Sequence, residues 1–278
     1  MSKPARLAVI NLMPQAECYF DYMEKVLPAG TQVDWIRVRN HAYGSSDQDV
    51  LRSTHRYYDD TDIDSCDAIL LTGSAMDANP DLTAATYWEE VVDMLRDAHS
   101  RSGSVAGICW GAQVVGRTFY DIDKRHFPNK VSGVFEMSNL APDHPLMRGL
   151  DDRFWLPQSR YAELDPAPLA AEIAAGRLIP LDWSEGSGYA SIVSEQGDVL
   201  MLQGHQDYPT ERLALEYRNA LARGESPPVP LNYDPDKPVN RWRANNRAFL
   251  AAWLEMAAER KRSTEAQGPL AAPVSQLS

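Results

Sequence analysis

The chain alternates short apolar runs with longer segments in which apolar residues recur at helical spacing. Short unbroken apolar runs predict strands of a parallel sheet, because both faces of such a strand are covered. The expected strands are 7–12, 33–38, 68–72, 104–108, 131–134, 190–193 and 199–203. The expected helices are 17–27, 88–99, 112–120, 210–223 and 245–260. This order predicts an α/β fold with a mostly parallel central sheet, flanked by helices and joined by right-handed crossovers.

The pattern shows neither an internal repeat nor a break that would mark a domain boundary. We therefore expect a single domain over residues 1–262. The proline-rich stretch 226–238 is either an ordered connector or a lid, and the sequence leaves both open. Residues 263–278 are small and polar, which predicts a flexible C-terminal tail.

Charge and cysteine usage narrow the class of protein. The 278 residues include 27 Lys and Arg against 39 Asp and Glu, a net charge of −12. Such an acidic chain is unsuited to nucleic acid or an anionic membrane, which are themselves polyanions. No apolar run approaches the ~18 residues that span a bilayer. The widely spaced Cys18, Cys66 and Cys109 form neither a disulfide framework nor a metal-binding pair, which favours a cytoplasmic protein without a metal site.

The segment Gly107-Ile-Cys109-Trp-Gly111 lies between a predicted strand and a predicted helix. Glycines two residues before and after a nucleophile permit the strained turn that exposes its side chain. The helix N-terminus beneath the sulfur would favour a thiolate. A buried structural cysteine is the plainer interpretation of one Cys, but the flanking glycines and their context favour a nucleophile.

A thiol nucleophile needs a base, and His205 directly follows the predicted strand 199–203. Functional sites of open α/β sheets form at this carboxyl edge. Asp207 lies two residues on, so its carboxylate can orient the imidazole as the third member of a triad. The other histidines lack this setting; they are His41, His55, His99, His126 and His144.

The loop after strand 68–72 is the expected oxyanion site. Gly73 permits close approach of the backbone, with Ser74 beside it. The amide of Trp110, at the start of the elbow helix, would be the second donor.

The motif Gly107-x-Cys109-x-Gly111-x-Gln113, with a distant His-x-acid pair, resembles glutamine-amidotransferase-like α/β proteins. Further segments resemble the homoserine O-acyltransferases, the O-acetyl- and O-succinyltransferases built on that fold. These segments are 10–14 (Ile-Asn-Leu-Met-Pro), 71–73 (Leu-Thr-Gly), 87–88 (Tyr-Trp), 130–136 (Lys-Val-Ser-Gly-Val-Phe-Glu), 148–154 (Arg-Gly-Leu-Asp-Asp-Arg-Phe), 159–161 (Ser-Arg-Tyr) and 204–205 (Gly-His). The ordered set spans residues 5–256.

The resemblance implies ping-pong acyl transfer from acetyl- or succinyl-coenzyme A to the hydroxyl of an amino acid, as in methionine biosynthesis. Cys109 would hold the acyl group, and His205 would deprotonate first the thiol and then the acceptor. Coenzyme A enters as a substrate, and no permanently bound cofactor is implied. The relatives suggest a homodimer.

The resemblance also assigns roles in the substrate site. Lys130 matches a lysine near the nucleophile that would stabilise thiolate or oxyanion charge. Ser159 and Arg160 match residues of the acceptor site, although a structural ion pair would also explain Arg160. Asp77 matches the position that separates acetyl from succinyl donors, and its charge would repel the succinyl carboxylate. An acetyl donor is therefore favoured.

The helix after the His-x-acid pair departs from the family pattern. Glu216 matches the residue that holds the acceptor ammonium, but Asn219 stands where the family carries an arginine for the carboxylate. Asn lacks the charge and the paired donors of Arg. Arg218 is one step around the helix, about 100° away. Homoserine, serine and other hydroxy amino acids therefore stay open as acceptors.

Coenzyme A is a polyanion, so an acidic chain needs local cations to bind it. The candidate patch is 124–126 (Lys-Arg-His) together with Lys130, and a solvated loop is the alternative. Two other functions remain: an amidotransferase-like hydrolase using the same triad, and a non-catalytic binding protein. The intact triad disfavours the second.

Overall fold

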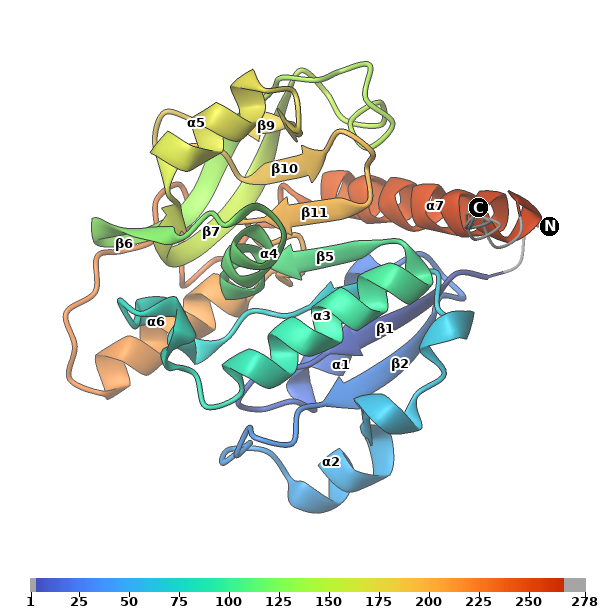
Figure 1. Ribbon diagram of the computed structural model, residues 1–278. Helices are drawn as coiled ribbons and strands as arrows, with labels where there is room; N and C mark the ends of the chain where they lie inside the picture. Colours follow the sequence, from blue (N-terminus) through green and yellow to red (C-terminus); the bar gives the residue numbers. More distant parts are fainter. Residues whose placement is uncertain (1–3, 268–278) are drawn as a thin grey trace, which may run out of the picture.

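The computed structural model describes residues 4–267, and its main feature is a sheet of eight strands (Figure 1). Their order is β3-β2-β1-β4-β5-β11-β10-β8. Every neighbouring pair from β3 to β11 is parallel, whereas β10 is antiparallel to both β11 and β8. The strands are β1 (Arg6–Ile10), β2 (Gln32–Arg37), β3 (Arg56–Tyr57), β4 (Ala68–Leu71), β5 (Val105–Ile108), β8 (Leu178–Pro180), β10 (Ser191–Ser194) and β11 (Val199–Leu202). The expected α/β fold with a mostly parallel sheet is confirmed.

Helices cover both faces of this sheet (Figure 1). On one face lie α3 (Trp88–Ser102) and α4 (Trp110–Tyr120), and on the other α1 (Cys18–Val26) and α7 (Arg243–Gln267). Successive residues of β4 alternate between these layers: Ile69 packs with the α3 and α4 side, and Leu70 packs with the α1 and α7 side. Burial on both faces explains why the strands appear as unbroken apolar runs.

A second, antiparallel sheet of three strands, in the order β7-β6-β9, was not predicted from the sequence. Its strands are β6 (Lys124–Asn139), β7 (Arg153–Leu164) and β9 (Asp182–Trp183). The predicted strand 131–134 is a fraction of β6, because polar side chains and a register shift between His126 and Val131 obscure the rest. No apolar pattern marks β7, whose middle carries Pro157 and the buried Arg160.

The remaining elements are short, apart from α6 (Arg212–Ala222), which agrees with the predicted helix 210–223. They are α2 (Gln48–Thr54), α5 (Pro166–Ala174) and the 3₁₀ turns η1 (Tyr58–Asp60), η2 (Ile63–Ser65), η3 (Ala75–Ala78) and η4 (Leu82–Ala84). Among the described residues, none of the helices combines the length and the apolar character needed to cross a bilayer.

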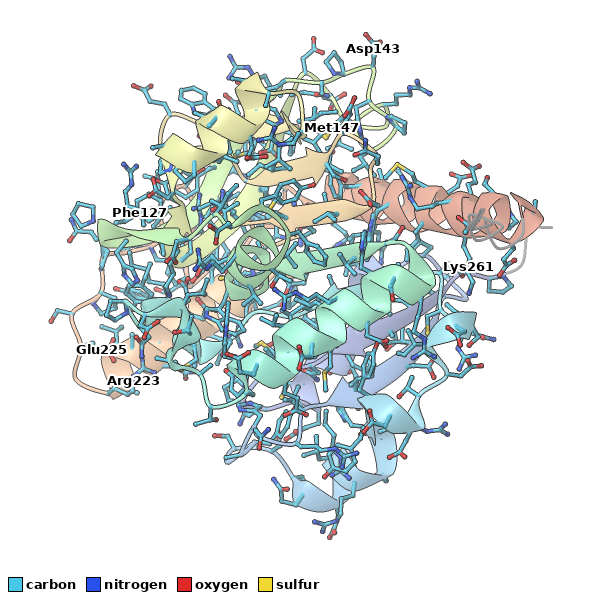
Figure 2. All side chains as sticks on the ribbon, viewed as in Figure 1. Phe127, Asp143, Met147, Arg223, Glu225 and Lys261 are labelled. Atoms are coloured by element: carbon cyan, nitrogen blue, oxygen red, sulfur yellow. The ribbon has the colours of Figure 1, made fainter. Side chains whose placement is uncertain are left out.

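The C-terminal helix is longer than expected. The tail predicted over 263–278 overlaps α7, which continues through 263–267; residues 268–278 lie outside the described part of the chain. Lys261, labelled in Figure 2, donates from Nζ to the carbonyl oxygens of Asp64 (2.6 Å) and Cys66 (2.9 Å). These bonds tie the late turns of α7 to the loop before β4.

The proline-rich segment 226–238 is ordered against the second sheet. The Leu231 amide donates to the Ser132 carbonyl (2.9 Å), and the Val134 amide donates to the Leu231 carbonyl (2.8 Å). The pairing along β6 at Leu231 suits a connector, and the same segment also lines a cavity at residues 226–228 and 230.

The turn from β5 into α4 has the strained geometry expected of an elbow. Cys109 has φ 55° and ψ −115°. A Cβ on Gly107 would lie 2.1 Å from the Gly111 carbonyl oxygen, and a Cβ on Gly111 would lie 2.6 Å from the Leu71 carbonyl oxygen. Backbone atoms occupy both places, so only glycine fits at either position.

We expect Gly107→Ala to lower the free energy of unfolding by about 3 kcal/mol or more, because the backbone of α4 cannot move away from the added methyl group. Urea denaturation would measure the loss. Gly44→Ala is the matched control, because a Cβ there meets no atom within 4 Å. Equal stability of the two variants would contradict this account of the elbow.

Candidate active site

A cavity of about 530 Å³ lies at the carboxyl ends of the central strands. Gly73 follows β4, Cys109 follows β5 and His205 follows β11, and all three line it. Residues of α1, α6, β6, β7 and the segment 226–230 complete the walls. The fold thus brings the three parts of the predicted chemistry to one edge of the sheet.

His205 and Asp207 form a buried pair. His205 Nδ1 lies 3.0 Å from Asp207 Oδ1, and the imidazole stacks on the Tyr208 ring at 3.8 Å between centroids. His205 Nε2 is buried and has no hydrogen-bond partner within residues 4–267. Because the carboxylate occupies Nδ1, Nε2 is the nitrogen available for proton transfer.

Cys109 is buried, and burial raises the pKa of its thiol well above the usual value. Asp77 acts in the same direction, whereas the Trp110 amide and Arg160 oppose it. Burial therefore opposes the thiolate that was expected from the helix N-terminus. A base that takes the thiol proton would favour the nucleophilic form.

The predicted oxyanion loop lies beside Cys109. A Cβ on Gly73 would be 3.5 Å from the Cys109 Cβ, and Gly73 and Ser74 both line the cavity. The Ser74 hydroxyl is engaged elsewhere: it is 2.7 Å from the Tyr87 hydroxyl and accepts from the Met76 amide. Backbone donors are therefore what this loop offers to an oxyanion.

Glu216 is the centre of a charged cluster on the cavity wall formed by α6. Its Oε1 accepts from the Tyr208 hydroxyl and from Arg212 Nε (3.0 Å), and its Oε2 accepts from the Ser159 hydroxyl and from Lys130 Nζ (3.5 Å). Burial would raise the pKa of Glu216, but Arg212, Lys130 and the two hydroxyls outweigh it and lower the pKa to about 2. Lys130, expected beside the nucleophile, makes its ion pair here.

Two of the predicted substrate residues lie outside the cavity wall. Arg160 is 1% exposed, and its guanidinium donates to Gln158 Oε1 and to the carbonyl oxygens of Ala162 and Ser187. Arg218 donates to the Pro235 carbonyl at 2.7 Å on the outer side of α6. Arg160 is thus held by neutral oxygens in the interior, and among the described residues it makes neither the predicted acceptor contact nor the ion pair given as the alternative.

Asp77 does line the cavity and is held rigidly. Its Oδ1 accepts from Gln113 Nε2 (2.7 Å), and its Oδ2 accepts from the Tyr161 amide. Lys124 Nζ donates to the Asp77 carbonyl (3.2 Å). A fixed carboxylate therefore faces the space next to Cys109.

The basic patch expected to bind phosphates is dispersed. Lys124 is buried, Arg125 pairs with Glu163, and the His126 ring lies 3.1 Å from the Asn79 carbonyl. Of the patch, Lys130 alone lines the cavity among the described residues. In that same part of the chain, His, Cys, Asp and Glu form no group of three suited to a metal ion.

Helix α6 presents a polar face to the cavity, and the sequence predicted only part of this face. Glu216 and Asn219 line it as expected, together with Arg212 and Arg223. Residues four apart lie on the same face of a helix, so the spacing from Arg212 to Glu216 could have indicated that Arg212 also lines the cavity. Arg223 Nε donates to Glu225 Oε1 at 2.7 Å, and both residues are labelled in Figure 2.

A cysteine elbow facing a His-x-acid pair on a mostly parallel sheet is the arrangement of glutamine-amidotransferase-like proteins. The structure is similar to a glutamine amidotransferase from Thermotoga maritima, with TM-score 0.62 and 14% identity, over 93% of this chain and 100% of the other. It is also similar to a glutamine amidotransferase from Methylobacillus flagellatus, with TM-score 0.54 and 16% identity, over 95% of each chain. At this identity, the likeness shows the shared fold.

The family model described as homoserine O-succinyltransferase matches residues 2–263, so the chain belongs to that family. A homoserine O-acetyltransferase from Petrotoga mobilis is 30% identical over 263 residues, covering 91% of this chain and 83% of the relative. A homoserine O-succinyltransferase from Shewanella amazonensis is 29% identical over 260 residues, covering 91% and 81%. The resemblance noted in the sequence is confirmed, and the protein is an acyltransferase.

We expect the Glu216 cluster to make stability depend on pH at the acid end. The pKa of Glu216 is lower in the folded protein than its ordinary value of 4.5, so its stabilisation is complete above that value and is lost as the pH falls toward 2. Glu216→Gln should cost about 3 kcal/mol of unfolding free energy at pH 7 and progressively less below pH 4.5. Urea denaturation at several pH values would measure this.

Glu255→Gln, at an exposed position of α7, is the control and should show no such pH dependence. A cost for Glu216→Gln that is the same at pH 7 and pH 3 would argue against an ionised, paired Glu216.

Proposed function

We propose that the protein transfers an acyl group from acyl-coenzyme A to the hydroxyl of homoserine or a related hydroxy amino acid, through a thioester on Cys109. The observation that carries the proposal is one cavity lined by the elbow cysteine, by His205 and by the Glu216 cluster. The family supports the reaction class, and the cavity supplies the groups the reaction needs.

In the first half-reaction His205 Nε2 takes the proton of the Cys109 thiol. The thiolate attacks the thioester carbonyl, and the Trp110 amide with the backbone after Gly73 stabilises the oxyanion. Coenzyme A leaves as a thiol with the proton returned by His205, and Asp207 keeps Nδ1 protonated throughout.

In the second half-reaction His205 accepts the proton of the acceptor hydroxyl. The oxygen attacks the thioester carbonyl, the ester product forms, and the sulfur leaves as a thiol with that proton. One base therefore serves both half-reactions, as a ping-pong sequence requires.

The wall around Asp77 favours a short, uncharged acyl group. Asp77 is buried, faces the cavity and is held by Gln113 and by the Tyr161 amide. A succinyl carboxylate beside it would meet a like charge at low dielectric. An acetyl donor meets no such repulsion, so acetyl-coenzyme A is the donor we propose.

The α6 wall supports binding of an amino acid while leaving its identity open. Glu216 is the proposed partner of the acceptor ammonium. Asn219, one turn along the same face, offers an amide in place of the charged fork of an arginine, so the carboxylate of homoserine would be held weakly. Serine and other hydroxy amino acids remain candidate acceptors.

Incubation with acetyl- or succinyl-coenzyme A, without an acceptor, tests the central intermediate. Intact-mass analysis should find one acyl group, on Cys109, and more of it from the acetyl donor. Addition of the correct hydroxy amino acid should then release it. Cys109→Ala should give no adduct, whereas Cys18→Ala, at an exposed cysteine, should behave as the wild type.

The acyltransferase proposal fails if neither donor labels Cys109. Ammonia release from glutamine, measured in parallel, reports on the hydrolase alternative.

Asn219→Arg tests the acceptor site. The added guanidinium should hold an acceptor carboxylate and raise kcat/KM for homoserine about 10-fold, the gain expected from one charge-assisted hydrogen bond. Asn219→Gln extends the side chain without charge and is the matched control. An unchanged acceptor profile in Asn219→Arg would mean that the carboxylate is bound elsewhere.

A further inference from the structure

The second carboxylate oxygen of Asp207 has its own partner. The hydroxyl of Tyr19 donates to Asp207 Oδ2 at 2.7 Å, while Oδ1 lies 3.0 Å from His205 Nδ1. Tyr19 lies in α1, 188 residues from Asp207, and lines the same cavity. Neither half-reaction of the proposed acyl transfer uses it.

Tyr19 is well placed to hold a neighbouring group still. Its side chain is 1% exposed, and its ring meets Tyr22 and Trp35 edge-on at 5.9 Å and 6.3 Å between centroids. It packs in the core layer formed with α7 on one face of the sheet. The position of its hydroxyl is therefore set by the packing of α1.

Asp207, in contrast, lies in a loop after β11, outside any helix or strand. Within the described residues, its carboxylate has two side-chain hydrogen-bond partners, His205 and Tyr19. Burial raises the pKa of the Tyr19 phenol well above its usual value, and the Asp207 charge acts in the same direction. Tyr19 stays protonated and is the donor.

We propose that Tyr19 is a positioning residue, which fixes the carboxylate of Asp207 in the orientation that aligns His205 with the Cys109 thiol. A carboxylate held at both oxygens cannot rotate about its terminal bond, so the plane and the tautomer of the imidazole are held as well. The inference rests on the proposed role of His205 as the base.

Alkylation of Cys109 by iodoacetamide at neutral pH tests the inference without any acyl substrate. The rate reports how well His205 removes the thiol proton, and peptide mass analysis separates Cys109 from the other cysteines. Tyr19→Phe keeps the ring and removes the hydroxyl, and it should slow alkylation about 10-fold, the order expected for loss of a hydrogen bond to a charged group. In turnover, kcat should fall by the same factor with KM unchanged.

Tyr58→Phe is the matched control. The Tyr58 hydroxyl also donates to a carboxylate, Asp97 Oδ2 at 2.7 Å, and its side chain is also buried, but it does not line the cavity. This variant loses the same kind of bond and should alkylate as the wild type. An equal loss of rate in both variants would mean a general effect on folding and would overturn the proposal.

A double-mutant cycle then identifies the route of the effect. In an Asp207→Ala background Tyr19 has no carboxylate to hold, so Tyr19→Phe should cost nothing further. A wild-type alkylation rate in Tyr19→Phe, or an undiminished cost in the Asp207→Ala background, would overturn the inference. Since no donor is involved, these results are distinct from a failure of acyl transfer itself.

Discussion

The site depends on one close backbone approach, that of helix α4 against the ends of β4 and β5. A Cβ on Gly107 would collide with the backbone of Gly111 in α4, and a Cβ on Gly111 would collide with the Leu71 carbonyl at the end of β4. Cys109, between them, has a positive φ of 55° and lies buried at the carboxyl edge of the sheet, where it lines the cavity. Every other part of the site lies around that point, because the neighbouring strands end at the same edge.

Burial determines the chemistry of this edge. A thiol removed from water stays protonated, and a carboxylate removed from water must be paired. Two buried carboxylates are paired in this way. Asp207 lies between His205 and Tyr19, and Glu216 lies among two cations and two hydroxyls. The pairs keep the charges at fixed positions, so little reorganisation is needed when a substrate enters.

The parts predictable from the sequence are those that local pattern determines. The strands β4, β5 and β11 are continuous apolar runs, and the elbow is marked by its glycines. In contrast, β7 carries Pro157 and a buried Arg160, and no local pattern shows that backbone carbonyls satisfy this guanidinium. The Tyr19 contact joins residues far apart in the chain, so only the packing of α1 against the sheet reveals it.

Ser159 connects the two sides of the cavity: its carbonyl oxygen is 3.9 Å from the Cys109 sulfur, and its hydroxyl donates to Glu216. Tyr208 also joins them, since its ring stacks on His205 and its hydroxyl donates to Glu216. Apart from these two residues, Cys109 and His205 on one side and Glu216 on the other come from separate elements of the chain. In the proposed acyl transfer, the reacting groups would come from strand ends, and one face of α6 would supply much of the polar surface for the acceptor. Under that proposal, substitutions on the cavity face of α6 would alter the acceptor site while leaving Cys109, His205 and Asp207, which lie on other elements, in place.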